Sequence, residues 1–159
     1  MQTGVSHSYS YGAVEKTTRA KILGLQDAIS ATEGSFDDME SEERYNDHYF
    51  APGMYGRKMR IQAGMCVVGK IHKHAHINVL LFGRIKVVTE FGDEILEGSK
   101  VWVSEPGTKR AVYALTDCEW LTLHANPTDT QDIREIEEAV IAPDFESFDR
   151  LQLESGVIV

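Results

Sequence analysis

Cysteine is scarce in this chain of 159 residues: Cys66 and Cys118 are the only two, and no Cys-x-x-Cys spacing occurs. A framework of several disulfides, the device that stabilises small secreted domains, is therefore excluded. No run of 18 apolar residues exists, and the first twelve residues, MQTGVSHSYSYG, have neither the basic nor the apolar region of a secretory signal. We expect a soluble protein that is made in a cytosol, keeps both thiols reduced and contacts no membrane.

Motifs of several enzyme classes are also missing. The sequence has no nucleophile elbow, no P-loop, no Gly-rich dinucleotide turn and no paired carboxylates at the end of a predicted strand. Hydrolase and nucleotide chemistry therefore have no support. The formal net charge of -9 also argues against direct nucleic-acid binding, because such proteins gather Lys and Arg into a basic stripe.

The negative charge is unevenly distributed. Residues 1–56 contain 4 basic and 9 acidic side chains, residues 57–127 contain 10 and 7, and residues 128–159 contain 2 and 9. The acidic ends either lie against the mildly basic centre of the same or a neighbouring subunit, or are simply solvated. The pattern leaves both interpretations open.

Changes in residue composition and apolar spacing along the chain predict three parts, of which the first is an N-terminal arm over residues 1–55. Residues 1–12 are rich in Ser, Tyr and Gly without any period, and residues 13–31 have apolar side chains at helical spacing. The acidic run over residues 32–47 indicates a linker, and Pro and Gly over residues 49–56 indicate turns. Such an arm has little core of its own.

The second part, residues 56–127, alternates short strands with tight turns. We predict strands near residues 57–62, 65–71, 74–82, 84–90, 100–103, 110–115 and 118–124. That density indicates one mainly β domain, an antiparallel barrel or sandwich. In the third part, residues 128–159, Thr128-Asp129-Thr130 predicts the cap of a helix that continues to about Val140. Pro143 predicts a second helix, whose Phe145, Phe148 and Leu151 share a face, and the apolar end Val-Ile-Val follows.

One stretch points to chemistry. Residues 72–82 read HKHAHINVLLF, and strict alternation would place His72, His74, His76 and Asn78 on the same face of one strand. A buried imidazole must be hydrogen-bonded, bound to a metal or hydrated, because leaving it unpaired costs about 1–3 kcal/mol. The histidines are therefore candidate metal ligands.

The region from about residue 55 to residue 127 resembles a cupin, a small antiparallel jelly roll with two sequence motifs. The first motif is His-x-His-x3-Glu followed by Gly, and here His72, His74 and Asn78 fall on it, with Asn in place of the acid. Gly83 comes two residues early in that register. In the register that Gly83 sets, His72 takes the place of the second His and His76 that of the acid.

The second cupin motif contains Pro-x-Gly and a His. Glu105-Pro106-Gly107 resembles the turn, but Arg110 stands where the His belongs, and His124 on the last predicted strand is the only obvious substitute. The resemblance therefore implies one divalent transition metal (Zn, Mn, Fe or Ni) held by His72, by His76 or His74, and by His124. In the alternative, the histidines are ordinary polar neighbours in a barrel that has lost its metal.

Two further residues are candidates for substrate contact. Arg110, next to Lys109, could clamp an anion at the mouth of the cavity, although a surface pair after a Pro-Gly turn is the commoner arrangement. Tyr113 could act as a general acid, although an aromatic residue on a strand usually belongs to the core.

The phrases GKIHKHAHINVLLFGRIKV, VSEPGTKRAVYAL and WLTLHANP resemble small cupin-like proteins of tailed bacteriophages. That resemblance implies synthesis in the cytoplasm of a bacterial host. We predict a virion or assembly accessory protein, associated with the tail or the head-tail junction. Its arms would contact neighbouring copies in a homo-oligomer or other phage structural proteins. The alternative is a mononuclear metal-dependent cupin enzyme, a dioxygenase, isomerase or lyase acting on a small metabolite.

Overall fold

A computed structural model describes residues 14–33, 35 and 44–156, and short antiparallel strands are its main secondary structure. In chain order the strands are β1 (Asn46–Ala51), β2 (Met54–Ile61), β3 (Cys66–Val68), β4 (Ile71–His72), β5 (His76–Phe82), β6 (Arg84–Thr89), β7 (Gly92–Glu97), β8 (Lys100–Ser104), β9 (Arg110–Ala114), β10 (Cys118–Ala125) and β11 (Ile141–Ala142). The helices are α1 (Val14–Ser30), α3 (Ile133–Val140) and α4 (Phe145–Glu154).

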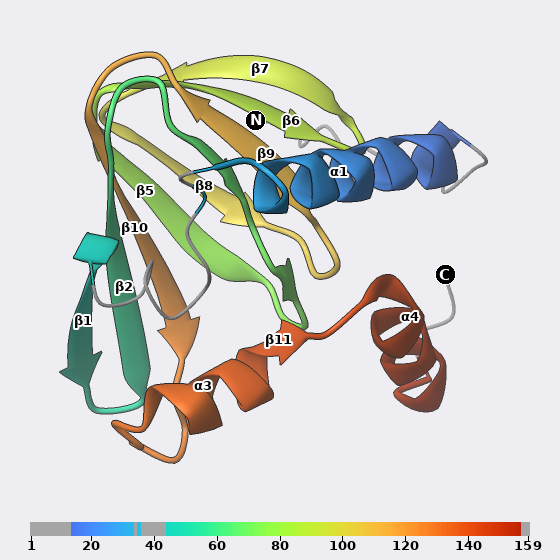
Figure 1. The fold of residues 1–159 in the computed structure, drawn as a ribbon. Helices are drawn as coiled ribbons and strands as arrows, with labels where there is room; N and C mark the ends of the chain where they lie inside the picture. Colours follow the sequence, from blue (N-terminus) through green and yellow to red (C-terminus); the bar gives the residue numbers. More distant parts are fainter. Residues whose placement is uncertain (1–13, 34, 36–43, 157–159) are drawn as a thin grey trace, which may run out of the picture.

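The strands form two sheets that face each other (Figure 1). The larger sheet has the order β1-β2-β10-β5-β8, the smaller one has the order β3-β9-β6-β7, and β11 pairs with β4 beside them. The prediction of a mainly β fold of antiparallel strands with short C-terminal helices is confirmed. The described strands do not close into a barrel, so the sandwich form of that prediction is the correct one.

The hydrophobic core lies between the two sheets. Its buried residues come from β2, β5 and β10 on one side and from β6, β7 and β9 on the other: Ile61, Leu80, Ile85, Val87, Leu96, Val112, Ala114, Cys118 and Trp120. Fully burying one Leu or Ile side chain contributes about 1.5–3 kcal/mol. Burial of the alternating apolar side chains of these strands therefore supplies most of the free energy that packs the two sheets together.

Two glycines permit close approaches that a side chain would block. Gly83 has a φ of +94°, and a Cβ there would lie 2.4 Å from the carbonyl oxygen of Asp117. Gly107 has a φ of +80°, and a Cβ there would lie 2.5 Å from the ring of Phe148. The first glycine makes the turn from β5 to β6, and the second lets α4 pack onto the turn that precedes β9.

Three strands occupy segments for which the sequence predicted none: β1, β7 and the two-residue β11, which pairs with β4. β1 covers residues 46–51, where the end of an acidic linker and the start of a turn were predicted, and it pairs along its whole length with β2. β7 covers residues 92–97 and pairs with β6. Both predictions were wrong because β1 and β7 lie at sheet edges, where one face is exposed and the apolar alternation is weak.

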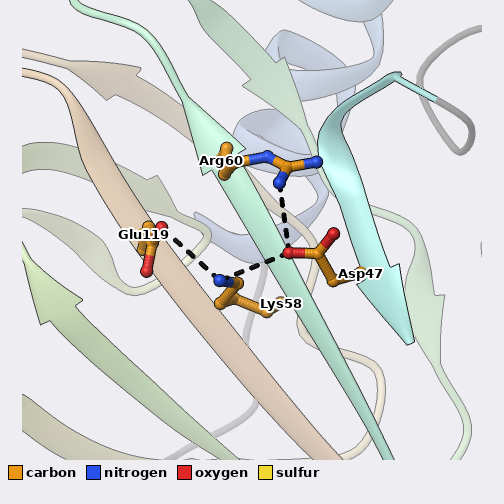
Figure 2. Close-up of polar contacts among 4 residues, drawn as sticks. All are labelled: Asp47, Lys58, Arg60 and Glu119. Atoms are coloured by element: carbon orange, nitrogen blue, oxygen red, sulfur yellow. Dashed lines mark hydrogen bonds and ion pairs between the residues drawn. The ribbon is translucent and has the colours of Figure 1, made fainter. Parts of the chain in front are cut away.

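Acidic and basic side chains link three strands of the larger sheet (Figure 2). Asp47 on β1 lies 3.2 Å from both Lys58 and Arg60 on β2, and Lys58 lies 3.5 Å from Glu119 on β10. Because ion pairs near the surface contribute little to stability, this cluster acts mainly on the register of the strands.

The helix predicted over residues 13–31 is confirmed as α1, which crosses the smaller sheet and contacts β3 and β6 (Figure 1). Its Ile22 is buried, and its Arg19 pairs with the buried Glu90 at 3.5 Å. The predicted arm over residues 1–12, most of the acidic linker and the Val-Ile-Val end lie outside the described residues.

The C-terminal helices follow the prediction with two corrections. The N-cap of α3 is Asp132, whose side chain accepts a hydrogen bond from the amide of Arg134, so the cap predicted at residues 128–130 was placed too early. In α4, Phe148 is buried, but Leu151 remains 40% exposed, so the predicted apolar face is only partly covered. Among the described residues, no helix is long and apolar enough to cross a bilayer.

Candidate metal centre

Three histidines from three strands meet between the sheets. His72 ends β4, His76 begins β5 and His124 lies near the end of β10. All three are buried, and their ring centroids lie 4.1 Å (His72 to His76), 4.9 Å (His72 to His124) and 4.7 Å (His76 to His124) apart. Each can offer one ring nitrogen so that the three nitrogens lie within 4.8 Å of one another.

His74 is excluded from this cluster. The predicted single strand over residues 74–82 is wrong at its start, because the chain bends between β4 and β5. The amide of Lys73 donates to the carbonyl of Val140 at 2.8 Å, which holds the bend against the end of α3. The side chain of His74 is consequently exposed, and the predicted common face of His72, His74 and His76 does not exist.

The backbone of His74 nevertheless contacts one histidine of the cluster. His76 Nδ1 lies 3.3 Å from the carbonyl oxygen of His74, which can only accept, so Nδ1 is the donor. The other nitrogen, His76 Nε2, is then unprotonated. A backbone carbonyl that sets the tautomer and the orientation of a ring in this way is typical of metal-binding histidines.

Two of the buried ring nitrogens have no hydrogen-bond partner. They are His72 Nδ1 and His76 Nε2, both fully removed from solvent. Leaving buried polar atoms unpaired costs about 1–3 kcal/mol each. A metal bound by these nitrogens would remove that cost, so the residues present fit a divalent cation.

The protonation state of the three rings also fits. Burial lowers the pKa of His76 to about 4 and that of His124 to about 3, with a further contribution from neighbouring positive groups. Burial, followed by the other two histidines, lowers the pKa of His72 further still. The rings are therefore neutral at pH 7, the state in which imidazole binds metals.

Asn78 is not part of the ligand set, although one alignment of the motif placed it on the acid. Its side chain is completely buried and fully engaged: Oδ1 accepts from Trp120 Nε1 at 3.0 Å, and Nδ2 donates to Ser104 Oγ at 2.6 Å. Asn78 instead organises the polar groups next to the histidines.

A small cavity of about 60 Å³ adjoins the cluster. His72, His76, Asn78 and Arg110 line it, so Arg110 faces the interior and is not part of a surface pair. Burial lowers the pKa of Arg110 to about 10, which still leaves it charged at pH 7. Tyr113 lies apart from the cavity lining: it is 46% exposed on β9, opposite Cys66.

Sequence reasoning missed two residues beside the histidines. Tyr55 is buried, its ring stacks on His124 with a centroid distance of 6.2 Å, and its hydroxyl lies 2.9 Å from His48 Nδ1. Arg57, two residues further along β2, lines the cavity. The available signal was the alternation of Tyr55, Arg57, Met59 and Ile61 on one face of β2.

A larger hollow of about 860 Å³ lies between α1, β3 and β11. None of the three clustered histidines lines it, and we assign no chemistry to it.

Comparisons with known proteins gave likenesses of fold. No family model and no curated protein matches this chain. Among solved structures, a cupin 2 domain-containing protein from Halorhodospira halophila is 16% identical with a TM-score of 0.47, covering 79% of this chain and 83% of that chain. A cupin-2 protein from Shewanella frigidimarina is 10% identical with a TM-score of 0.43, covering 69% and 99%. KdgF from Halomonas sp. is 17% identical with a TM-score of 0.45, covering 55% and 79%.

Proposed function

We propose that this protein is a mononuclear metal-binding cupin in which His72, His76 and His124 hold one divalent transition metal: Zn, Mn, Fe or Ni. The observation that carries the proposal is the pair of buried, unpartnered ring nitrogens, His72 Nδ1 and His76 Nε2, in a group of three neutral histidines. Imidazole suits all four metals.

We further propose that the centre is catalytic. Three protein ligands leave coordination positions open, as in catalytic sites, whereas structural sites close the coordination sphere with a fourth protein ligand. When bound, the metal supplies Lewis acidity toward an oxygen of a small metabolite. The residues of the chain orient that molecule, because Asn78, Ser104 and Arg110 present fixed polar groups beside the histidines.

The test is stoichiometric binding of Co²⁺, followed by its visible absorption, to the purified protein. We expect one equivalent in the wild type. His72→Ala, His76→Ala and His124→Ala should each weaken binding by more than about 100-fold. The matched control is His74→Ala, which removes an exposed histidine from the same segment and should bind like the wild type. Failure of the wild type to bind Co²⁺, Zn²⁺, Mn²⁺, Fe²⁺ or Ni²⁺ would contradict the proposal.

The role in a phage virion or its assembly is the second proposal. The feature that favours it is the exposed apolar surface on the outside of the larger sheet, where Val101 and Val103 are 66% and 60% exposed. Surfaces of this kind mark contacts with other proteins. Mass spectrometry of purified particles of the phage that encodes the chain should detect it as a component. Its absence from the particles would leave the metal-dependent role alone.

A further inference from the structure

The cavity beside the histidines has a small volume and a mixed lining. Five apolar side chains line it, Met59, Ile61, Val67, Val112 and Trp120, together with eight polar or charged ones that include His72, His76 and Arg110. Because one water-sized group needs about 10–15 Å³, a volume of about 60 Å³ holds on the order of five non-hydrogen atoms. The cavity thus admits a molecule of the size of a two- or three-carbon acid.

The charge of the cavity wall is one-sided. Its lining residues include Arg57, Lys70 and Arg110 but no Asp or Glu. Lys70 is paired with Glu137 at 2.6 Å, so its charge is already offset. The charge considered for ligand binding is that of Arg110. No negative charge among the lining residues therefore offsets the guanidinium of Arg110.

The contacts of Arg110 are all with neutral groups. Nη2 donates to Ser104 Oγ at 2.5 Å, Nη1 lies 3.5 Å from Asn78 Oδ1, and the guanidinium lies 5.6 Å from the centroid of the Trp120 ring. A partly buried cation without a carboxylate is costly, since desolvation is not repaid by an opposite charge. An anionic ligand would supply that charge.

Arg110 is also held in a fixed orientation. Both of its acceptors are fixed in turn, because Asn78 Nδ2 donates to Ser104 Oγ and Trp120 Nε1 donates to Asn78 Oδ1. These two contacts use two of the five guanidinium N–H groups, and three remain for a ligand. An oriented planar guanidinium matches a carboxylate, which it binds through two parallel hydrogen bonds.

We propose that the cavity binds a small carboxylic acid of about four to six non-hydrogen atoms, with its carboxylate on Arg110 and its other end toward the histidines. The proposal rests on the proposed function only where it places the other end of the acid near a metal. Arg110 recognises the carboxylate, and that recognition does not need a bound metal ion.

The test uses the full chain without metal and pyruvate as the probe, with binding followed by isothermal titration calorimetry. The neutral analogue pyruvamide has the same size and lacks the charge. We expect the wild type to bind pyruvate at least about 10-fold more tightly than pyruvamide. Equal binding of the two compounds, or binding of neither, would overturn the proposal without any variant.

Variants then assign the effect to one residue. Arg110→Met should weaken pyruvate binding by about 30-fold or more, and Arg110→Lys should weaken it less, since it keeps the charge but loses the planar fork. The matched control is Arg84→Met, which removes an exposed arginine from the start of another strand and should bind like the wild type. Undiminished pyruvate binding by Arg110→Met would overturn the proposal, and if that variant does not fold, undiminished binding by Arg110→Lys does the same.

Co²⁺ titration of the same variants separates this inference from the proposed metal site. We expect Arg110→Met to retain its equivalent of Co²⁺, because Arg110 is not a ligand. A wild type that binds pyruvate through Arg110 but no metal would contradict the metal proposal and leave the carboxylate site standing. A wild type that binds metal but not pyruvate would contradict the carboxylate site and leave the metal proposal standing.

Discussion

The two faces of the larger sheet differ in the residues that occupy the middle of β5 and β10. On the inner face, neighbouring strands contribute His76 and Asn78 from β5 and Trp120 and His124 from β10, all buried. On the outer face, the same two strands with β8 present aliphatic side chains in paired rows: Ile77, Val79, Leu121, Leu123, Val101 and Val103. The inner face also carries the apolar core residues Ile61, Leu80 and Cys118, so its polar groups are embedded in the core. The outer face is apolar where a sheet with one solvated face is usually polar.

The buried histidines on one face and the exposed aliphatic side chains on the other both indicate partners that the single chain does not supply. Inside, every polar group of Asn78 is hydrogen-bonded, but ring nitrogens of His72 and His76 are not, which fits a metal. Outside, the apolar rows end at the ion-pair cluster of Asp47, Lys58 and Glu119 (Figure 2). A surface with an apolar centre and a charged rim resembles an interface between proteins.

The largest effect should follow a change on the inner face, Asn78→Leu. The substitution replaces a polar residue with an apolar one of similar size, yet we expect a loss of about 3–5 kcal/mol of unfolding free energy. The reason is that Trp120 Nε1, Ser104 Oγ and Arg110 would lose their shared partner in a buried place.

Urea denaturation measures this loss, with Ile77→Asn as the matched change on the outer face of the same strand. Ile77 is 42% exposed, so its replacement should cost much less. Equal losses for the two variants would show that the faces do not differ.

The second-largest effect should be the stabilisation of the folded protein by a metal bound at the inner face. If the three histidines form the site, a free metal concentration of 100 times Kd raises the unfolding free energy by about 2.7 kcal/mol. Thermal denaturation with and without Zn²⁺ measures the shift. We expect it in the wild type and in His74→Ala and expect none in His124→Ala. A shift that persists in His124→Ala would place the bound metal elsewhere.

The stability of the metal-free protein should fall in mild acid. The pKa values of His76 and His124 are lowered to about 4 and about 3, against about 6.5 in the unfolded chain. Between these values the unfolded state binds more protons, so lowering the pH favours unfolding. The two histidines together should cost about 2 kcal/mol between pH 6.5 and pH 5.5.

Urea denaturation across this range measures the slope, and the double variant His76→Ala, His124→Ala should have a shallower one. His74→Ala, which alters an exposed ring, should keep the slope of the wild type. An unchanged slope in the double variant would contradict the assignment to these two histidines.

The smallest effect on stability should come from the outer face, where the consequence is association. We propose a second copy of this chain as the partner of this face, because a two-fold contact can place its aliphatic rows against themselves. Val101→Lys should shift the protein toward the monomer in light scattering while unfolding free energy changes little. Ile95→Lys, an exposed aliphatic position on the smaller sheet, is the control and should leave the mass unchanged. A wild type that is monomeric at micromolar concentration would contradict the proposal.

Local patterns were sufficient for much of the fold. Turn residues and alternation predicted the strands of the core, and the N-terminal and C-terminal helices were predicted from apolar spacing and capping residues. The failures have physical causes. Edge strands β1 and β7 have weak alternation, and the N-cap of α3 moved to Asp132 because several capping residues compete in residues 128–132.

The sequence by itself determined the mainly β antiparallel fold, the supply of histidines within a few residues of one another, and an arginine after the Pro106-Gly107 turn. Only the tertiary structure decided which side chains meet. The chain bends between β4 and β5, where the amide of Lys73 donates to the carbonyl of Val140, and the side chain of His74 therefore lies outside the histidine cluster. The pairing of β10 with β5 places His124, which is distant in sequence, beside His76. Alternation fixes the parity of side chains only along one continuous strand, whereas a bend or a pairing between distant strands depends on backbone contacts that no local pattern contains.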